Sequence, residues 1–209
     1  PLRSLVMSGH QVGKSLSSAA AYIMLPGLNP DFTSLVVTPL AEQVRRFRTV
    51  YVNPLICDSP FQSLWSGPGT KSTLYQHEFP NRSNLLFSFA SLSADRIRGI
   101  KADAIAFDEI QDFNVDHLPV IQATTDASKF GMIQYTGTPK SLDNTIHAIW
   151  MNSSQAEWVT KCTHCGHWNR PSAEYDLLDM IGPWHPDISE ESPGTICAQC
   201  KKPINPRYG

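Results

Sequence analysis

Short apolar runs alternate with longer amphipathic stretches over roughly the first 150 positions of the chain. Two stretches, 14–25 and 41–56, have the composition and spacing of helices, and the first ends at the turn-forming "PGLNPD". Five short apolar runs that end in turns are the predicted strands: 2–7, 33–39, 84–90, 102–109 and 130–139. Strands that alternate with helices predict an α/β fold, in which a mostly parallel sheet is covered on both faces.

This regular alternation stops near residue 155. The chain beyond it consists of short polar segments, prolines and two C-x-x-C pairs. We therefore expect two domains, residues 1–155 and residues 156–209. Within the first of them, residues 58–83 are rich in proline, glycine and serine and show only a weak pattern.

Composition and charge narrow the class of protein. Of the 209 residues, 41% are hydrophobic and 17% are charged, which are the values of a globular chain. No apolar run approaches the ~20 residues that span a bilayer, and no signal peptide opens the chain, so no membrane partner is expected. The net charge of -2 gives no general argument for nucleic acid, and any DNA contact has to come from local patches.

The segment "SGHQVGKS", residues 8–15, lies between the first predicted strand and the first predicted helix. It fits the phosphate-loop pattern G-x-x-x-x-G-K-[ST], except that Ser8 takes the place of the first glycine. Backbone N–H groups at a helix N-terminus attract a phosphate, Lys14 adds charge for the β- and γ-phosphates, and the Ser15 hydroxyl suits Mg²⁺. The expected nucleotide-binding residues are Gly9, His10, Gln11, Val12, Gly13, Lys14 and Ser15. By itself the GKS tripeptide is equally compatible with chance.

Two later segments strengthen the nucleotide hypothesis. Asp108 and Glu109 end an apolar strand, where the first carboxylate would hold Mg²⁺ through water and the second would orient and deprotonate the attacking water. The alternative for this pair is a solvated acidic turn. Thr136, Gly137 and Thr138 end the next strand and are expected to sense the γ-phosphate and couple its loss to movement. Together the three segments predict a P-loop NTPase of the RecA/ASCE type that uses ATP and Mg²⁺.

The sequence also resembles a known family. The variant loop, "VVTPLAEQVRRF" (36–47), "SADRIRGIKADAIAFDE" (93–109) and "TGT" (136–138) are similar to the ATPase domain of the large terminase subunit of tailed bacteriophages. The resemblance covers about residues 1–150, and that family often lacks the first loop glycine. It often has an Arg-Gln pair where this chain has His10 and Gln11, so the role of that arginine is not carried over to His10.

The resemblance implies an ATP-driven motor that translocates double-stranded DNA into procapsids. The implied partners are the DNA, the small terminase subunit, the portal protein and further copies of the chain in a homo-oligomeric ring, and the implied location is the host cytoplasm. Arg98 stands at the position of an arginine proposed to act in trans as an arginine finger, with Arg96 as the weaker candidate. The alternative for Arg98 is a surface or structural ion pair.

Two parts of the resembling family are not expected in this sequence. One is the segment upstream of the first strand that contacts adenine. The other is the C-terminal nuclease, because the carboxylates after residue 158 follow no strand-like pattern; they are Glu174, Asp176, Asp179, Asp187, Glu190 and Glu191. The chain is therefore expected to be part of a longer protein.

Four cysteines form two knuckles typical of a zinc ribbon: Cys162, Cys165, Cys197 and Cys200. The 31 residues between the pairs exceed the usual spacing, but the cost of closing a loop grows slowly with its length. His164 and His167 are alternative ligands that flank better-placed cysteines. The fifth cysteine, Cys57, is expected to be a small buried hydrophobe.

The predicted zinc module has two possible roles. It organises its own fold, or Lys201, Lys202 and Arg207 add a patch that binds phosphate. Some phage terminases carry such a zinc insertion near the ATPase–nuclease junction, which agrees with its place here.

Two other functions remain open at this point. One is a superfamily-two helicase or another nucleic-acid remodeller, although no second RecA-like domain with a helicase arginine motif is found in the sequence. The other is a zinc-ribbon adaptor whose ATPase fold is inactive. The residues that argue against an inactive fold are Lys14, Ser15, Asp108 and Glu109.

Overall fold

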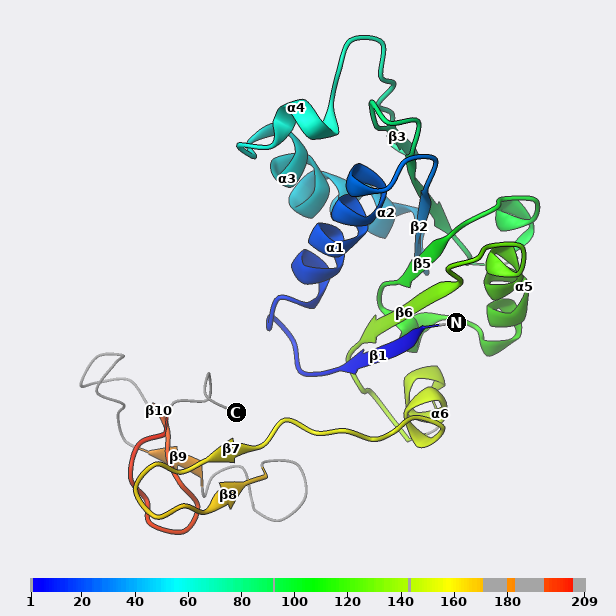
Figure 1. The fold of residues 1–209 in the computed structure, drawn as a ribbon. Helices are drawn as coiled ribbons and strands as arrows, with labels where there is room; N and C mark the ends of the chain where they lie inside the picture. Colours follow the sequence, from blue (N-terminus) through cyan, green and yellow to red (C-terminus); the bar gives the residue numbers. More distant parts are fainter. Residues whose placement is uncertain (1, 92, 143, 171–179, 183–193, 205–209) are drawn as a thin grey trace. The chain divides into compact units, whose positions relative to one another are not determined.

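The computed structural model describes residues 2–91, 93–142, 144–170, 180–182 and 194–204, and the chain divides into two compact units, Pro1–Ser153 and Ser154–Gly209. The larger unit is built on a six-stranded sheet of order β1-β6-β5-β2-β4-β3 (Figure 1). Its strands are β1 (Arg3–Met7), β2 (Thr33–Thr38), β3 (Gln76–Glu78), β4 (Asn84–Phe89), β5 (Ala104–Phe107) and β6 (Met132–Gly137). All neighbouring strands are parallel except β3, which pairs antiparallel with β4. The predicted mostly parallel α/β fold is confirmed.

Helices cover both faces of this sheet (Figure 1). One face carries α1 (Lys14–Leu28), α2 (Ala41–Phe47), α3 (Asn53–Cys57) and α4 (Gln62–Trp65), and the other carries α5 (Leu118–Gln122) and α6 (Thr145–Met151). A π-helical segment, Arg48–Val52, joins α2 to α3. Because side chains alternate along a strand, Val36 packs into the core on the α1 side, while Leu35 and Val37 pack into the core on the α5 side. Burial on both faces explains why these strands read as continuous apolar runs.

Helix α1 runs three residues beyond the predicted end at residue 25. Pro26 lies inside its last turn, where a proline normally breaks a helix because it has no N–H to donate. Here the exposed carbonyls of this turn find partners outside the helix: Asn81 Nδ2 donates to the carbonyl oxygens of Pro26 at 2.7 Å and Gly27 at 3.2 Å. This tertiary contact stabilises a turn that the local sequence does not favour.

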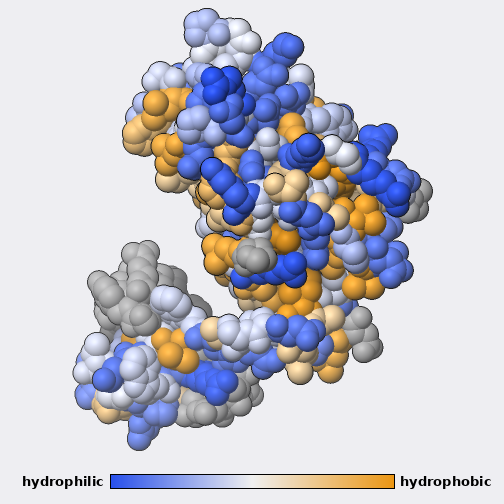
Figure 2. Space-filling model, turned by 45° about the vertical axis from the view of Figure 1, so that its right-hand side comes forward, coloured by the Kyte–Doolittle hydropathy of each residue, from blue (hydrophilic) through white to orange (hydrophobic). Residues whose placement is uncertain are grey.

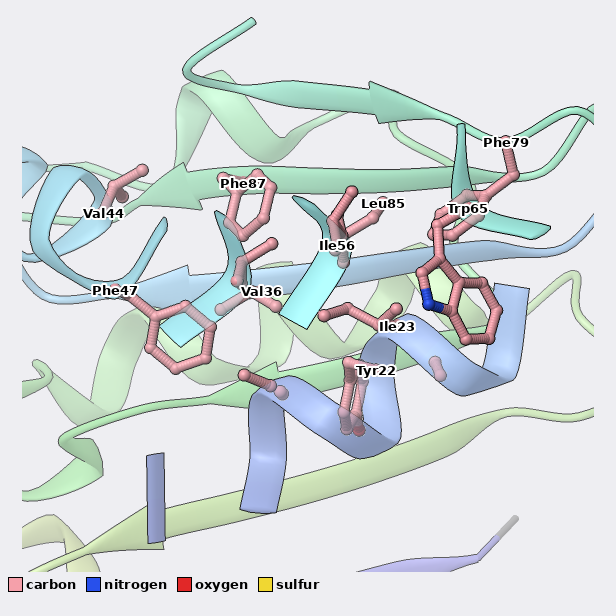
Figure 3. Close-up of a cluster of buried hydrophobic side chains, with 14 of the residues drawn as sticks. Tyr22, Ile23, Val36, Val44, Phe47, Ile56, Trp65, Phe79, Leu85 and Phe87 are labelled. Atoms are coloured by element: carbon pink, nitrogen blue, oxygen red, sulfur yellow. The ribbon is translucent and has the colours of Figure 1, made fainter. Parts of the chain in front are cut away.

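Gly27 provides the space for the indole of Trp65 from α4, which faces α1 in Figure 3. A Cβ atom at Gly27 would lie 2.0 Å from Trp65 Cζ3. The indole also packs edge-on against Phe79, with ring centroids 6.2 Å apart. The "PG" pair therefore serves the packing of this core and does not end the helix.

The segment 58–83 holds elements that its weak pattern did not predict, among them α4 and β3. His77 lies in β3 with 2% of its surface exposed, and its ring is fixed by Trp65 O at 2.7 Å from Nε2 and Ser72 Oγ at 3.2 Å from Nδ1. Burial lowers the pKa of His77 below its ordinary value, against the opposing effect of the hydrogen bond to Trp65 O. The imidazole is thus held in its neutral form.

The expectation that Cys57 is buried was wrong. Cys57 is exposed at the last position of α3, and its neighbour Ile56 fills the buried position of that turn. One helical step of about 100° separates the two side chains, so only one of them faces the sheet.

The smaller unit has two short antiparallel pairs in its described residues. They are β7 (Thr160–Lys161) with β8 (Trp168–Asn169), and β9 (Ile181–Gly182) with β10 (Gly194–Thr195). Its buried cluster is small and half made of cysteine: Cys162, Met180, Cys197 and Ile204. So few apolar side chains are a weak core for a unit of this size.

Hydrophilic and hydrophobic residues are interspersed over the visible face of the molecule (Figure 2). Within the residues that the structure describes, no helix is both long enough and apolar enough to cross a membrane.

Candidate nucleotide site and cysteine cluster

The phosphate-loop segment connects the end of β1 to the start of α1. Ser8 N donates to Gly137 O at 3.3 Å, which joins the start of the loop to the end of β6. Gly13 is the N-cap of α1 with φ 86°, and Gln11 has φ 58°, so the loop reverses direction through two left-handed residues. The residues from Gly9 to Gly13 are exposed. The loop therefore presents an open helix N-terminus, which favours an anion.

Lys14 reaches back across this loop. Its Nζ donates to Ser8 O at 3.1 Å, to Gly9 O at 2.5 Å and to Thr138 Oγ1 at 3.1 Å. An ammonium has three protons, so these acceptors use all of them. The lysine thereby connects the loop with the segment after β6.

The Ser15 hydroxyl donates to the carboxylate of Asp108, at 3.1 Å from Oδ1 and 3.3 Å from Oδ2. Thr136 Oγ1 lies 3.0 Å from Asp108 Oδ1 on the other side. Burial raises the pKa of Asp108, and the charge of Glu109 adds to the rise, while the two hydroxyl groups oppose it. A hydroxyl and a carboxylate at one point are the oxygen ligands that Mg²⁺ prefers, so Ser15 and Asp108 fit the predicted metal.

Glu109 follows Asp108 with a left-handed backbone, φ 57°. This conformation is uncommon for a residue with a side chain and is found where the surrounding structure fixes it. A cavity of about 170 Å³ opens beside the two carboxylates; it is lined by Ser15, Gln43, Arg46, Phe47, Tyr51, Asp108 and Glu109. This volume holds a few water molecules next to the group expected to activate one.

Arg98 lies apart from this cluster. Its Nε forms an ion pair with Asp95 Oδ1 at 3.1 Å, and 67% of its side chain is exposed. Across the described ranges, no ion pair or hydrogen bond joins Arg98 to the loop or to the two carboxylates. Arg96, the weaker candidate, packs over the ring of Phe89 with its guanidinium carbon 4.9 Å from the centroid.

The four predicted zinc ligands come together in the smaller unit. The Sγ atoms of Cys162 and Cys200 are 3.7 Å apart, as are those of Cys165 and Cys197, and all four lie within 4.8 Å of one another. Four thiolates about 2.3 Å from one zinc ion, at the corners of a tetrahedron, are about 3.8 Å apart. The spacing therefore fits a Zn²⁺ ion. The alternative ligands His164 and His167 are not part of this group.

The two knuckles have the same backbone hydrogen bonds. Gly166 N donates to Cys162 O, and Lys201 N donates to Cys197 O, both at 2.9 Å. Both donors have a left-handed backbone, with φ 77° and φ 58°. Burial raises the pKa of the Cys197 thiol, but N–H donors of Cys200 and Gln199 and the neighbouring thiols lower it to about 6, so its metal-binding thiolate is favoured.

Asn169 connects the two knuckles and was not predicted. Its side chain is fully buried, Nδ2 donates to Thr160 O at 3.1 Å, and Oδ1 accepts from Ala198 N at 2.9 Å. Polar groups around a metal site orient its ligands. The only sequence signal for this residue is its position four residues after Cys165 in a short strand.

Comparison with known proteins identifies the family. Residues 3–208 match the family described as phage terminase large subunit gpA, ATPase domain. The chain belongs to that family. The match includes both cysteine pairs, so the smaller unit lies within the terminase family domain. No curated protein matches the chain.

Solved terminase structures share the fold. The large terminase ATPase domain of Thermus phage P74-26 has a TM-score of 0.54 and 19% identity, over 74% of this chain and 66% of that domain. The large terminase of bacteriophage HK97 has a TM-score of 0.56 and 14% identity, over 72% of this chain and 32% of its own. That of a thermophilic bacteriophage, in complex with ADP, has a TM-score of 0.52 and 14% identity, over 74% and 37%. The chain thus spans less than two thirds of these relatives.

Residues of α2 and the π-helical segment line the cavity beside the carboxylates, although no sequence motif pointed to them: Gln43, Arg46 and Tyr51. Arg207 and the six acidic residues considered for a nuclease lie outside the described residues. Lys201 and Lys202 are exposed beside the second knuckle.

Proposed function

We propose that this chain is the ATP-hydrolysing part of a terminase motor that moves double-stranded DNA into phage procapsids. The observation that carries the proposal is the bonding of Lys14 to Thr138, and of Ser15 and Thr136 to Asp108, which brings three distant segments to one point. Family membership supports this function over a helicase. The retained Lys14, Ser15 and Asp108 support activity over an inactive adaptor fold.

The residues divide the reaction between them. Lys14 and the loop from Gly9 to Ser15 hold the β- and γ-phosphates, and Ser15 with Asp108 holds Mg²⁺, which neutralises phosphate charge when bound. Glu109 orients a water in the adjoining cavity and takes its proton. Thr136, Gly137 and Thr138 end the strand between the loop and the carboxylates, where loss of the γ-phosphate alters the contacts of Lys14.

Arg98 supplies a positive charge to a neighbouring subunit of a ring. Its exposure and its separation from the chain's own loop support action in trans. The ring acts in the host cytoplasm with the DNA, the small terminase subunit and the portal protein as partners. We assign the ATPase role to residues 1–155.

The cysteine cluster of residues 156–209 binds one Zn²⁺ through Cys162, Cys165, Cys197 and Cys200. The ion organises the small unit, whose apolar cluster is too small to do so.

Paired substitutions test the ATPase. Lys14→Ala is expected to remove ATP binding, whereas Glu109→Gln keeps binding and removes hydrolysis, because the phosphate cradle and the water activator are different groups. Calorimetry of ATP binding and phosphate release by the same preparations measure the two effects. Lys140→Ala is the matched control, since Lys140 forms an exposed ion pair with Asp112. A Glu109→Gln protein that still hydrolyses ATP would refute the assignment.

A further inference from the structure

The side chain of Gln111 lies between the expected water activator and the coupling segment. Its Nε2 donates to Glu109 Oε2 at 2.5 Å, and its Oε1 accepts from Thr138 N at 3.0 Å. Only 8% of the residue is exposed. Gln111 is thus a buried amide with both ends bonded inside the candidate site.

The chemistry of the two partners permits one orientation of this amide. The backbone N–H of Thr138 only donates, and an ionised Glu109 carboxylate only accepts. Rotating the amide by 180° would therefore place two donors and two acceptors face to face. Gln111 is the kind of side chain that joins these two groups, because a glutamate or a leucine at this position loses at least one bond.

The neighbouring backbone leaves room for this amide and for little else. A Cβ atom at Gly137 would lie 2.3 Å from Gln111 Oε1 and 3.0 Å from a methyl group of Ile110. The glycine of the coupling segment is thus matched to Gln111. On the other side, Glu109 has the left-handed backbone that needs support from its surroundings.

Resting on the ATPase function proposed above, we infer that Gln111 is a positioning residue that fixes the Glu109 carboxylate and links it to Thr138. Thr138 Oγ1 in turn contacts Lys14 Nζ at 3.1 Å. Three consecutive hydrogen-bonded contacts therefore connect the phosphate-loop lysine to the water activator. A movement of the segment after β6 displaces the carboxylate through Gln111.

Two substitutions separate positioning from structural support. Gln111→Leu keeps the bulk and loses both bonds, while Gln111→Glu keeps the acceptor for Thr138 N and replaces the donor to Glu109 by a repelling carboxylate. Both are expected to lower kcat by roughly 10²-fold with little change in KM for ATP, because a misplaced catalytic group slows chemistry more than binding. Gln122→Leu is the matched control, since Gln122 donates to Tyr135 Oη away from the site.

The comparison between the two variants is decisive under single-turnover conditions with the 209-residue chain. A structural role predicts that Gln111→Glu is milder than Gln111→Leu, so a near-normal kcat in Gln111→Glu would overturn the proposal. If the wild-type chain binds no ATP, the proposed function fails, and the contact is judged by NMR. The Gln111 side-chain amide signal, assigned by its loss in Gln111→Leu, is expected to shift in Glu109→Ala, and an unshifted signal would overturn the positioning role.

Discussion

Ser15 Oγ and Asp108 Oδ1 lie 3.1 Å apart, although 93 positions separate them in the chain. The contact exists because β6 lies between β1 and β5, so that the ends of three parallel strands meet. Side chains at the carboxyl ends of such strands converge on one crevice. The cost of this arrangement is a buried carboxylate, Asp108.

Removing that charge is expected to stabilise the metal-free protein. Asp108→Asn keeps the shape of the side chain, and burial disfavours the ionised carboxylate, as the raised pKa of Asp108 shows. Thermal unfolding at pH 7 in the presence of a chelator should give a higher Tm for the variant, about 2–4 °C for each kcal/mol gained. With Mg²⁺ and ATP the order should reverse, because only the wild type gains ligand-binding energy. A lower Tm of the variant without metal would contradict the reasoning.

Subunit mixing tests Arg98. In an assembled ring, Arg98→Ala should abolish turnover and leave nucleotide affinity nearly unchanged, since an arginine finger is worth ~10³–10⁵ in rate. In the isolated chain, which should hydrolyse ATP poorly, the same change should cost little. Rings that mix Arg98→Ala with Glu109→Gln subunits should recover activity wherever an intact Glu109 meets a neighbour's intact Arg98. No recovery in rings shown to be mixed would leave Arg98 with its ion pair to Asp95 alone. Arg96→Ala is the control.

Metal analysis tests the cysteine cluster. One Zn²⁺ per chain is expected, with sulfur ligands at about 2.3 Å by X-ray absorption. Cys197→Ser should lose the metal and unfold the smaller unit, whereas Cys57→Ser should change neither, because Cys57 is exposed outside the cluster. A chain that contains no metal and keeps its fold after chelation would refute the site.

Acid should weaken the larger unit through His77. The lowered pKa means that the folded state binds a proton there less readily than the unfolded chain. The stability is therefore fully present above about pH 6.5 and is lost as pH falls through the folded-state value. Urea unfolding at pH 7.5 and pH 5 should show a smaller loss for His77→Gln than for the wild type. His164→Gln, a change at an exposed residue of the other unit, should keep the full loss.

Much of the fold was predictable because the decisive information is local. The apolar strands, Gly13-Lys14-Ser15 and the pair Asp108-Glu109 each announce themselves by pattern. Interactions between distant segments were not predictable: the turn at Pro26 depends on Asn81, and the edge strand β3 is only three residues long.

The same limit applies to the site. Gln111 stood two positions after Glu109, as a polar residue in a segment that turned out to be buried, but its role depends on Thr138. Buried Cys57 was predicted from residue type, and a single helical step reversed it. The order of the strands, which creates the crevice, carries no signal in any one segment.

The three acceptors of Lys14 affect which anions the loop selects. Since Ser8 O, Gly9 O and Thr138 Oγ1 already surround the ammonium, an incoming anion has to replace them and does not meet a bare cation. Orthophosphate offers few compensating contacts beyond that exchange. A triphosphate chain reaches the lysine, the helix N-terminus and a metal at Asp108 at once. The closed loop thus discriminates against the abundant small anions of the cell and reserves the site for a polyphosphate.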